Sequence, residues 1–376
     1  MHALKRVLPA LLPAVLLAAP SLSISDWAAV GRSSGRLKVV ALLPLTGPAV
    51  SLGMFLRYGI ELGRRELAES GEGGADVDVL YLDTMSEPEG GAAAIQAVLA
   101  KGRPDAVICA LSSVSRAVIP FLEREGILTV VTAADGPDLT KGTKHVVRLY
   151  PGARDNLGPV ANYMLLRFDN IAALYIDEDS GREDQRMLAK MVGDAGKTLS
   201  AAEPFESRAV DIRPAIDRVL ASSPDAVFVT GYGRALVSAI RQLRELAGGM
   251  PIFSEANFGN PTVLKALGEA ADGIVFDGTD LELSVSADKR TEQFRRLYRE
   301  TFRTDPYHLV GFAHDSILLL AEAARKAGGK PDKAALTSLS HFKGVMGGIF
   351  LDPEGESRIS LRLILRQKGR NVPLES

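Results

Sequence analysis

The sequence predicts an α/β protein of two similar Rossmann-like lobes, in each of which helices flank a parallel sheet. Three observations predict this class. Short apolar runs, typical of strands buried on both faces, alternate with stretches of helical spacing. The same alternation starts again near residue 171. The tetrapeptide Pro-Asp-Ala-Val at residues 104–107 returns at residues 224–227, and both copies open a buried strand.

The elements follow in order along the chain. In the first series we expect strands at residues 37–43, 77–83, 106–110 and 128–132, and helices at 55–68, 90–101 and 116–124. In the second series we expect strands at 171–176, 226–230 and 251–254, and helices at 183–192, 212–221 and 234–246. Strands joined through helices imply right-handed crossovers and parallel sheets. The tail predicts helices at 291–301 and 312–327, then a hairpin of residues 348–351 and 361–366 around a turn at 352–355.

Length and charge narrow the class of protein. A chain of 376 residues is long for one core and comfortable for two α/β lobes. Lys+Arg 44 against Asp+Glu 46 leaves a formal net charge of −2, so no basic excess attracts nucleic acid. We therefore expect no nucleic-acid partner. The single cysteine, Cys109, lies in an apolar run without a neighbouring base, which favours a core residue over a catalytic thiol.

The N-terminus has the features of a secretory signal peptide, which we place at residues 1–25. Lys5 and Arg6 precede an apolar run from Val7 to Ala19, and small residues follow it. The run is short for a membrane span, although a retained anchor is the rival interpretation. We therefore expect export to the periplasm, cleavage between Ala19 and Ala29, and no stable membrane insertion after leader removal.

Several local motifs, in their order and spacing, resemble those of the type I periplasmic binding proteins, in particular the family that binds leucine, isoleucine and valine. They are the Leu45-Thr46-Gly47-Pro48 turn, the Ser112-Ser113 loop with residues 123–128 and 137–140, the turn at 268–273, and the closing hairpin at 347–355. The resemblance covers residues 37–366.

This resemblance implies two lobes joined by a three-stranded hinge. Lobe 1 would hold residues 37–148 plus 281–345, and lobe 2 residues 149–279 plus 346–376. It also implies that the lobes close on a ligand in the cleft between them and that the closed form is presented to an inner-membrane ABC permease.

The loops that follow the strands are the expected ligand site, because helix N-termini expose unpaired N–H groups there. Ser112 and Ser113 follow the strand at 106–110, and Ser112 matches a ligand-contacting serine of the family. Both serines are equally compatible with capping a helix that begins near Ser115. Tyr232 matches a family tyrosine that faces the ligand, with packing on the lobe surface as the alternative. Glu255 lies one residue from the family position for a glutamate that pairs with a ligand ammonium.

Ala133, Ala134 and Asp135 follow the strand at 128–132, where small residues let a ligand approach the backbone. Asp135 departs from the family, since a hydroxyl residue that helps hold the ligand carboxylate aligns with it. A carboxylate there repels a ligand carboxylate unless it is protonated or paired. Asp135 is therefore expected to receive a cation, an amine or a sugar hydroxyl, or only to begin the turn Asp135-Gly136-Pro137. The identity of the ligand stays open.

Motifs of enzymes and metal sites fail in context. Residues 31–35 match a serine-hydrolase elbow, but no strand precedes them. Gly231 and Gly233 begin a dinucleotide-binding fingerprint that lacks its last glycine. His308 and His314 lie on different helix faces, so they are not expected to bind one metal ion. We predict no catalytic residue, metal or cofactor. The expected function is that of a non-enzymatic binding protein of an ABC importer, with a small polar ligand such as an amino acid or amide. The alternative is a ligand-sensing or regulatory envelope protein of the same fold.

Overall fold

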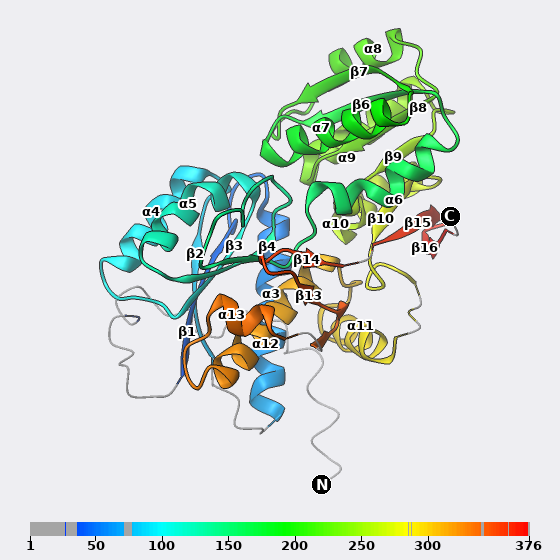
Figure 1. Cartoon of the computed structure of the whole chain (residues 1–376). Coiled ribbons are helices and arrows are strands. Elements are labelled where there is room, and N and C mark those ends of the chain that lie inside the picture. The colour runs from blue at the N-terminus through cyan, green and yellow to red at the C-terminus, as the bar shows by residue number, and fades with distance from the viewer. Residues whose placement is uncertain are drawn as a thin grey trace, which may run out of the picture. The chain divides into compact units, whose positions relative to one another are not determined.

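The computed structural model describes Trp27 and residues 36–70, 77–284, 286, 288–339, 342–359 and 361–374. The predicted signal peptide at residues 1–25 lies outside the described residues. Internal contacts divide the chain into two compact units, which Figure 1 shows in ribbon form. Unit 1 comprises the described residues of Met1–Ala133, Leu139–Tyr150 and Ser286–Arg358, and unit 2 those of Ala134–Asp138, Pro151–Val285 and Ile359–Ser376.

The units begin and end at other residues than the predicted lobes in four places. Leu149 and Tyr150, expected in lobe 2, belong to unit 1. Residues 346–358, expected in lobe 2, belong to unit 1, where the Arg148 N–H donates to the Gly355 carbonyl. Residues 281–285, expected in lobe 1, belong to unit 2, where the Asn371 side chain donates to the Glu282 carbonyl. The short segment Ala134–Asp138 also belongs to unit 2. Hinged closure of the two lobes stays a prediction.

Unit 1 is built on a five-stranded parallel sheet of order β2-β1-β3-β4-β5. Every residue of β3 is buried, as expected for a strand that helices cover on both faces. The strands are β1 (Leu37–Leu43), β2 (Val77–Asp83), β3 (Ala106–Ala110), β4 (Leu128–Ala133) and β5 (Val146–Arg148). The helices are α3 (Val50–Ser70), α4 (Pro88–Leu99), α5 (Ser112–Arg124), α11 (Lys289–Phe302), α12 (His308–Lys326) and α13 (Lys333–Thr337).

Unit 2 contains a seven-stranded sheet of order β16-β15-β10-β9-β8-β6-β7, parallel from β10 to β7. Its core includes Leu157, Leu188, Phe228 and Leu363. The strands are β6 (Asn170–Ile176), β7 (Thr198–Phe205), β8 (Ala226–Thr230), β9 (Ile252–Ser254), β10 (Val275–Gly278), β15 (Arg362–Gln367) and β16 (Arg370–Pro373). The helices are α6 (Ala153–Leu165), α7 (Asp179–Asp194), α8 (Arg213–Ala221), α9 (Gly233–Leu246) and α10 (Pro261–Leu267), with short turns η3 (Ala256–Gly259) and η4 (Gly268–Ala271).

Each predicted strand and helix of the two alternating series is confirmed, and five strands and α-helices that belong with these series were missed: β5, α6, β7, α10 and β10. The reason is plain for β7, a strand at the end of the sheet. Its sequence has no continuous apolar run, and only Phe205 is buried. β10 is short and contains an aspartate, Asp277, so its apolar signal is weak.

The predicted pairing of residues 348–351 with 361–366 is wrong. β13 (Phe350–Leu351) pairs instead with β14 (Ser357–Arg358) in unit 1. The Gly355 N–H donates to the Asp352 carbonyl, so the predicted turn closes a shorter hairpin. β15 pairs antiparallel with β10 and β16 in unit 2. Burial of Ile364 in that larger sheet gives this strand more apolar contact than a two-stranded hairpin offers.

The repeated tetrapeptide makes the same hydrogen bonds in both units. In unit 1, Asp105 Oδ2 accepts the Lys38 N–H at 3.0 Å, and the Asp105 N–H donates to the Lys38 carbonyl at 2.8 Å. In unit 2, Asp225 Oδ2 accepts the Asn170 N–H at 2.9 Å, and the Asp225 N–H donates to the Asn170 carbonyl at 2.7 Å. In each case the aspartate ties the start of one strand to the start of its neighbour. The two units therefore share a local design as well as a strand order.

Candidate functional site

Each sheet has one point at which the direction of winding reverses. In unit 1, β1 lies between β2 and β3, and in unit 2, β6 lies between β7 and β8. Ligands of open parallel sheets bind beyond the carboxyl ends of the strands at such a switch point. We call residues 44–49 and 111–115 the carboxyl edge of unit 1. We call residues 177–184, 230–232 and 255 the carboxyl edge of unit 2.

Ser112 and Ser113 lie at the carboxyl edge of unit 1, in the first turn of α5. The preceding residue, Leu111, has a positive φ of 68°, a conformation that non-glycine residues rarely adopt. Its N–H donates to the carbonyl of Ala133 at 2.8 Å, which joins the ends of β3 and β4. Three predicted site residues, Ser112, Ser113 and Ala133, are thereby grouped in unit 1.

The interpretation of these serines as caps of a helix that begins near Ser115 is wrong. α5 begins at Ser112, and Leu111 occupies the N-cap position without a side-chain hydrogen bond to the helix. The serines therefore belong to the first turn itself, where N–H groups and hydroxyls favour hydrogen-bond acceptors and negative charge. Ser112 is 4% exposed.

Asp83 binds the loop that forms part of this edge, and both of its oxygens accept hydrogen bonds. Oδ1 accepts the N–H groups of Leu45, Thr46 and Met85, and Oδ2 accepts the Thr46 hydroxyl at 2.6 Å. Burial opposes ionisation, but these hydrogen bonds outweigh it and lower the pKa of Asp83. The carboxylate therefore fixes the loop after β1, and the edge itself presents neutral groups.

Tyr232 and Glu255 lie at the carboxyl edge of unit 2, each at the N-cap position of the element that follows its strand. The Tyr232 hydroxyl donates to Oε2 of Glu178 at 2.5 Å. The Glu255 side chain accepts the Asn257 N–H at 2.7 Å through Oε2, and its Oε1 has no hydrogen-bond partner. Tyr232 is 5% exposed and Glu255 is 1% exposed, so both are built into the unit and neither is a surface residue.

Asp184 is a second buried carboxyl at this edge. Oδ2 accepts the Thr230 hydroxyl at 2.6 Å, while Oδ1 has no hydrogen-bond partner. Asp135 belongs to the same unit, and its carbonyl accepts the N–H of Ala153, the first residue of α6. The predicted residues Ala134, Asp135, Tyr232 and Glu255 are thus grouped in unit 2.

The carboxyls of unit 2 interact electrostatically and disfavour one another's ionisation. Burial is the main cause that raises the pKa of Asp184 well above its usual range, and the charges of Asp135 and Glu255 add to it. Burial likewise raises the pKa of Glu255 to about 8, and the charge of Asp135 raises it further. The N–H groups of Asn257 and Gly231 lower it in part. Among the described residues, no Lys, Arg or His pairs with Asp184 or Glu255. This edge therefore has an excess of buried carboxyl groups, which stay protonated more readily than usual.

Two further buried polar side chains, Asp277 and Asn156, lie on β10 and α6, which pack against each other. Oδ1 of Asp277 accepts the N–H of Val160 at 3.0 Å, just after Pro159, where a proline weakens the helix's own hydrogen bonding. Burial, with the charge of Glu255, raises the pKa of Asp277 well above its usual range. Asn156 is 0% exposed, and neither of its amide atoms has a hydrogen-bond partner.

Sequence reasoning missed Asp184, Asp277 and Asn156. The run of charges at 177–186 reads as a solvated helix face, yet Gly181, Asp184, Leu188 and Val192 recur at helical spacing and are all buried. This periodicity was the signal that could have identified Asp184. Asn156 carries the same kind of signal, because it lies on the buried face of α6 with Ala153 and Val160. For Asp277 no local signal exists, because its burial depends on the packing of β10 against α6.

A cavity of about 540 Å³ lies in unit 1, and none of the predicted site residues lines it. Residues of α3, α11 and α12 line it, among them Glu66 and Arg290, which pair at 2.7 Å. Glu66 also contacts the buried His314, which in turn contacts Asp315 at 2.9 Å. Asp315 accepts the N–H groups of Val345 and Met346, so this network holds α12 to the segment after β11 (Lys343–Gly344).

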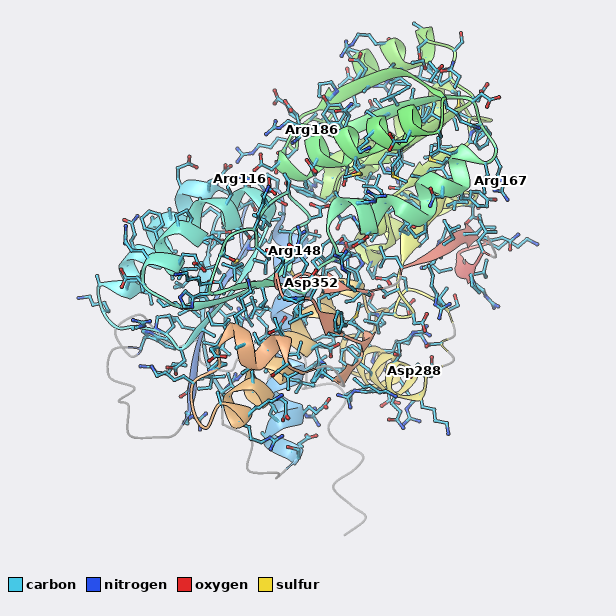
Figure 2. All side chains as sticks on the ribbon, viewed as in Figure 1. Arg116, Arg148, Arg167, Arg186, Asp288 and Asp352 are labelled. Carbon is cyan, nitrogen blue, oxygen red and sulfur yellow. The ribbon has the colours of Figure 1, made fainter. Side chains whose placement is uncertain are left out.

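The described residues lack the features of a membrane span and of a metal site. None of their helices is long and apolar enough to cross a membrane. Within the same residues, no group of three or more His, Cys, Asp or Glu side chains is arranged to hold a metal ion. Charged side chains of unit 1 serve its structure, as Arg148 does by pairing with Glu356 at 2.7 Å (Arg148 is labelled in Figure 2).

Comparison with known proteins decides the family. The family model described as "Periplasmic binding protein" matches residues 36–360. This chain belongs to the periplasmic binding protein family. A relative from Pseudomonas aeruginosa, named the leucine-, isoleucine-, valine-, threonine-, and alanine-binding protein, is 22% identical over 343 residues, which cover 89% of this chain and 91% of the relative.

Solved structures of other periplasmic binding proteins have the same fold. The branched-chain amino acid substrate-binding protein LivJ from Streptococcus pneumoniae, solved with isoleucine, aligns with a TM-score of 0.81 at 20% identity, covering 91% of this chain and all 100% of LivJ. A solute-binding protein from R. palustris, solved with benzoate, aligns with a TM-score of 0.83 at 20% identity, covering 90% of this chain and 95% of that one. The predicted fold class and family are thereby confirmed.

Proposed function

We propose that this periplasmic binding protein is exported, captures one small polar solute and delivers it to an inner-membrane ABC permease without changing it chemically. Solute binding is the function of its family. The charged and apolar leader at residues 1–25 supports export. The observation that carries the proposal is the presence, in both units, of buried polar side chains at the switch point of the sheet.

The two carboxyl edges suit different parts of a ligand. In unit 1, Ser112 and Ser113 at the start of α5 favour a hydrogen-bond acceptor, and the small Ala133 leaves its backbone approachable. In unit 2, Asp135, Tyr232 and Glu255 favour hydrogen-bond donors, with Ala134 as the small neighbour. We propose that one ligand is held by both edges and that hinge closure completes its binding.

A thermal-shift screen over amino acids, amides, amines and aromatic acids tests this function. A true ligand at one hundred times its Kd raises the free energy of unfolding by about 2.7 kcal/mol, which is easily measured. We expect Ser112→Ala and Tyr232→Phe each to weaken the hit about five- to tenfold, the loss of one hydrogen bond. The matched control, Asp217→Asn, alters an exposed residue of α8 and leaves affinity unchanged. A screen without any stabiliser counts against the proposal.

A further inference from the structure

Unit 2 buries two carboxyl groups, Asp184 and Glu255, that no described Lys, Arg or His side chain pairs with. Asp184 is 2% exposed and Glu255 is 1% exposed. A buried carboxylate without a cation loses its hydration and gains nothing in return, which costs several kcal/mol for each charge. The described cations of the nearby helix are committed elsewhere. Arg182 pairs with Asp177 and Asp179, and Arg186, labelled on α7 in Figure 2, pairs with Glu183 at 3.0 Å.

The carboxyls also have unused hydrogen-bonding capacity. Oδ1 of Asp184 and Oε1 of Glu255 are buried and have no partner, although the second oxygen of each group is bonded within unit 2. Buried polar atoms in folded proteins almost always have partners, so such atoms need a specific explanation. A ligand that donates hydrogen bonds satisfies both oxygens at once.

An uncharged side chain provides independent support for a ligand at this place. Ala153 and Val160 lie on one face of α6, and their N–H groups donate to the Asp135 carbonyl and to Asp277, respectively. Asn156 lies between them on that face at helical spacing, is fully buried, and has both amide atoms unpaired. An asparagine in this state gains one acceptor and one donor from a bound polar molecule.

We propose that the carboxyl edge of unit 2 selects a ligand with two protonated amino groups, and that Asp184 and Glu255 each accept one of them. Among the described residues no metal-binding group of side chains is present, so an organic cation fits this edge better than a metal ion. Asp135 lies where the resemblance expects a hydroxyl for a ligand carboxylate, and a carboxyl side chain at that position disfavours a ligand carboxylate. The inference rests on the proposed solute-binding function and names its substrate class: diamines and polyamines.

Calorimetric titration of the full-length mature protein at pH 8.5 tests the inference with putrescine, cadaverine and spermidine, against n-butylamine, leucine and benzoate. We expect at least one diamine or polyamine to bind tenfold or more tightly than n-butylamine, and leucine and benzoate to bind more weakly still. Asp184→Asn preserves the shape of the side chain and removes its charge. We expect it to weaken diamine binding at least tenfold while n-butylamine changes less, because one of two ion pairs is lost.

Asp217→Asn removes an exposed carboxylate of unit 2 and is expected to leave every titration unchanged. If Asp184→Asn fails to fold by circular dichroism, Asp135→Thr tests the same excess of carboxyl groups, since it should weaken diamines and favour leucine. Binding of leucine or benzoate without binding of any diamine would overturn the inference and leave the proposed function intact. Failure of every solute class would overturn both.

Discussion

The two units have the same strand order, but the side chains at their carboxyl edges have opposite chemical character. In both, the second, first, third and fourth strands of the series lie side by side in that order, and an aspartate of the repeated tetrapeptide joins the first strand to the third. Yet the edge of unit 1 presents serine hydroxyls and a helix N-terminus, whereas the edge of unit 2 buries Asp184 and Glu255. The comparison teaches that topology decides where a ligand meets the chain, while a few buried side chains decide what charge it meets.

The largest expected effect comes from the pH dependence of unit 2. The pKa of Glu255 is about 8 in the folded state against a usual 4.5, so the folded protein retains a proton that the unfolded chain releases in this window. Stability therefore falls as pH rises from about 4.5 to 8, by on the order of 4 kcal/mol for this group. Asp135, Asp184 and Asp277 surround it, and the raised pKa values of Asp184 and Asp277 act in the same direction.

Urea denaturation at pH 5 and pH 8.5 measures this effect in the ligand-free protein. Glu255→Gln should gain stability at pH 8.5 relative to wild type and should flatten the pH dependence. A variant with the same slope as wild type would show that Glu255 is ionised and paired in the folded state.

A smaller effect is expected where a helix approaches the loop before it. A Cβ on Gly53 of α3 would lie 2.1 Å from the Pro44 carbonyl oxygen, and one on Gly181 of α7 would lie 2.1 Å from that of Ile176. Gly53→Ala and Gly181→Ala should each destabilise the protein by about 1–3 kcal/mol, because the backbone must move. Gly193→Ala, on α7 with open space around it, is the control and should be neutral or stabilising. Equal behaviour of Gly181 and Gly193 would contradict the close approach.

The repeated aspartates, Asp105 in unit 1 and Asp225 in unit 2, allow the stability of the same hydrogen bond to be compared between the units. Asp105→Ala removes the acceptor of a partly buried N–H and an ion pair with Lys330 at 2.7 Å, so we expect a cost of about 1–2 kcal/mol. Asp225→Ala removes the same acceptor where water replaces it more easily, and about 0.5–1 kcal/mol is expected. Chemical denaturation of the two variants measures the difference. A larger loss at Asp225 would mean that solvent exposure does not govern these bonds.

The smallest effect is a predicted lack of reaction at Cys109, the single cysteine of the chain, which lies in unit 1. Burial raises the pKa of its thiol to about 12, and a hydrogen-bonding contact with Ser115 offsets only part of this increase. A thiol reagent at pH 8 should leave the native protein unmodified and label the unfolded chain fully. Gly53→Ala should accelerate labelling more than Gly181→Ala, since the cysteine reports opening of unit 1. Equal acceleration would show that the two units open together.

The sequence by itself determined the alternation of strands and helices, the duplication, and the loops that carry Ser112, Asp135, Tyr232 and Glu255. These features depend on local periodicity and on strand order, which neighbouring residues encode. Only the tertiary structure decided that β15 joins the sheet of unit 2 and that α5 begins at Ser112. It also decided that Asp184 and Asp277 are buried near Glu255 and that Asn156 is buried on α6. The physical reason is that burial of a polar group depends on segments far apart in the chain, and no local pattern records which segments pack together.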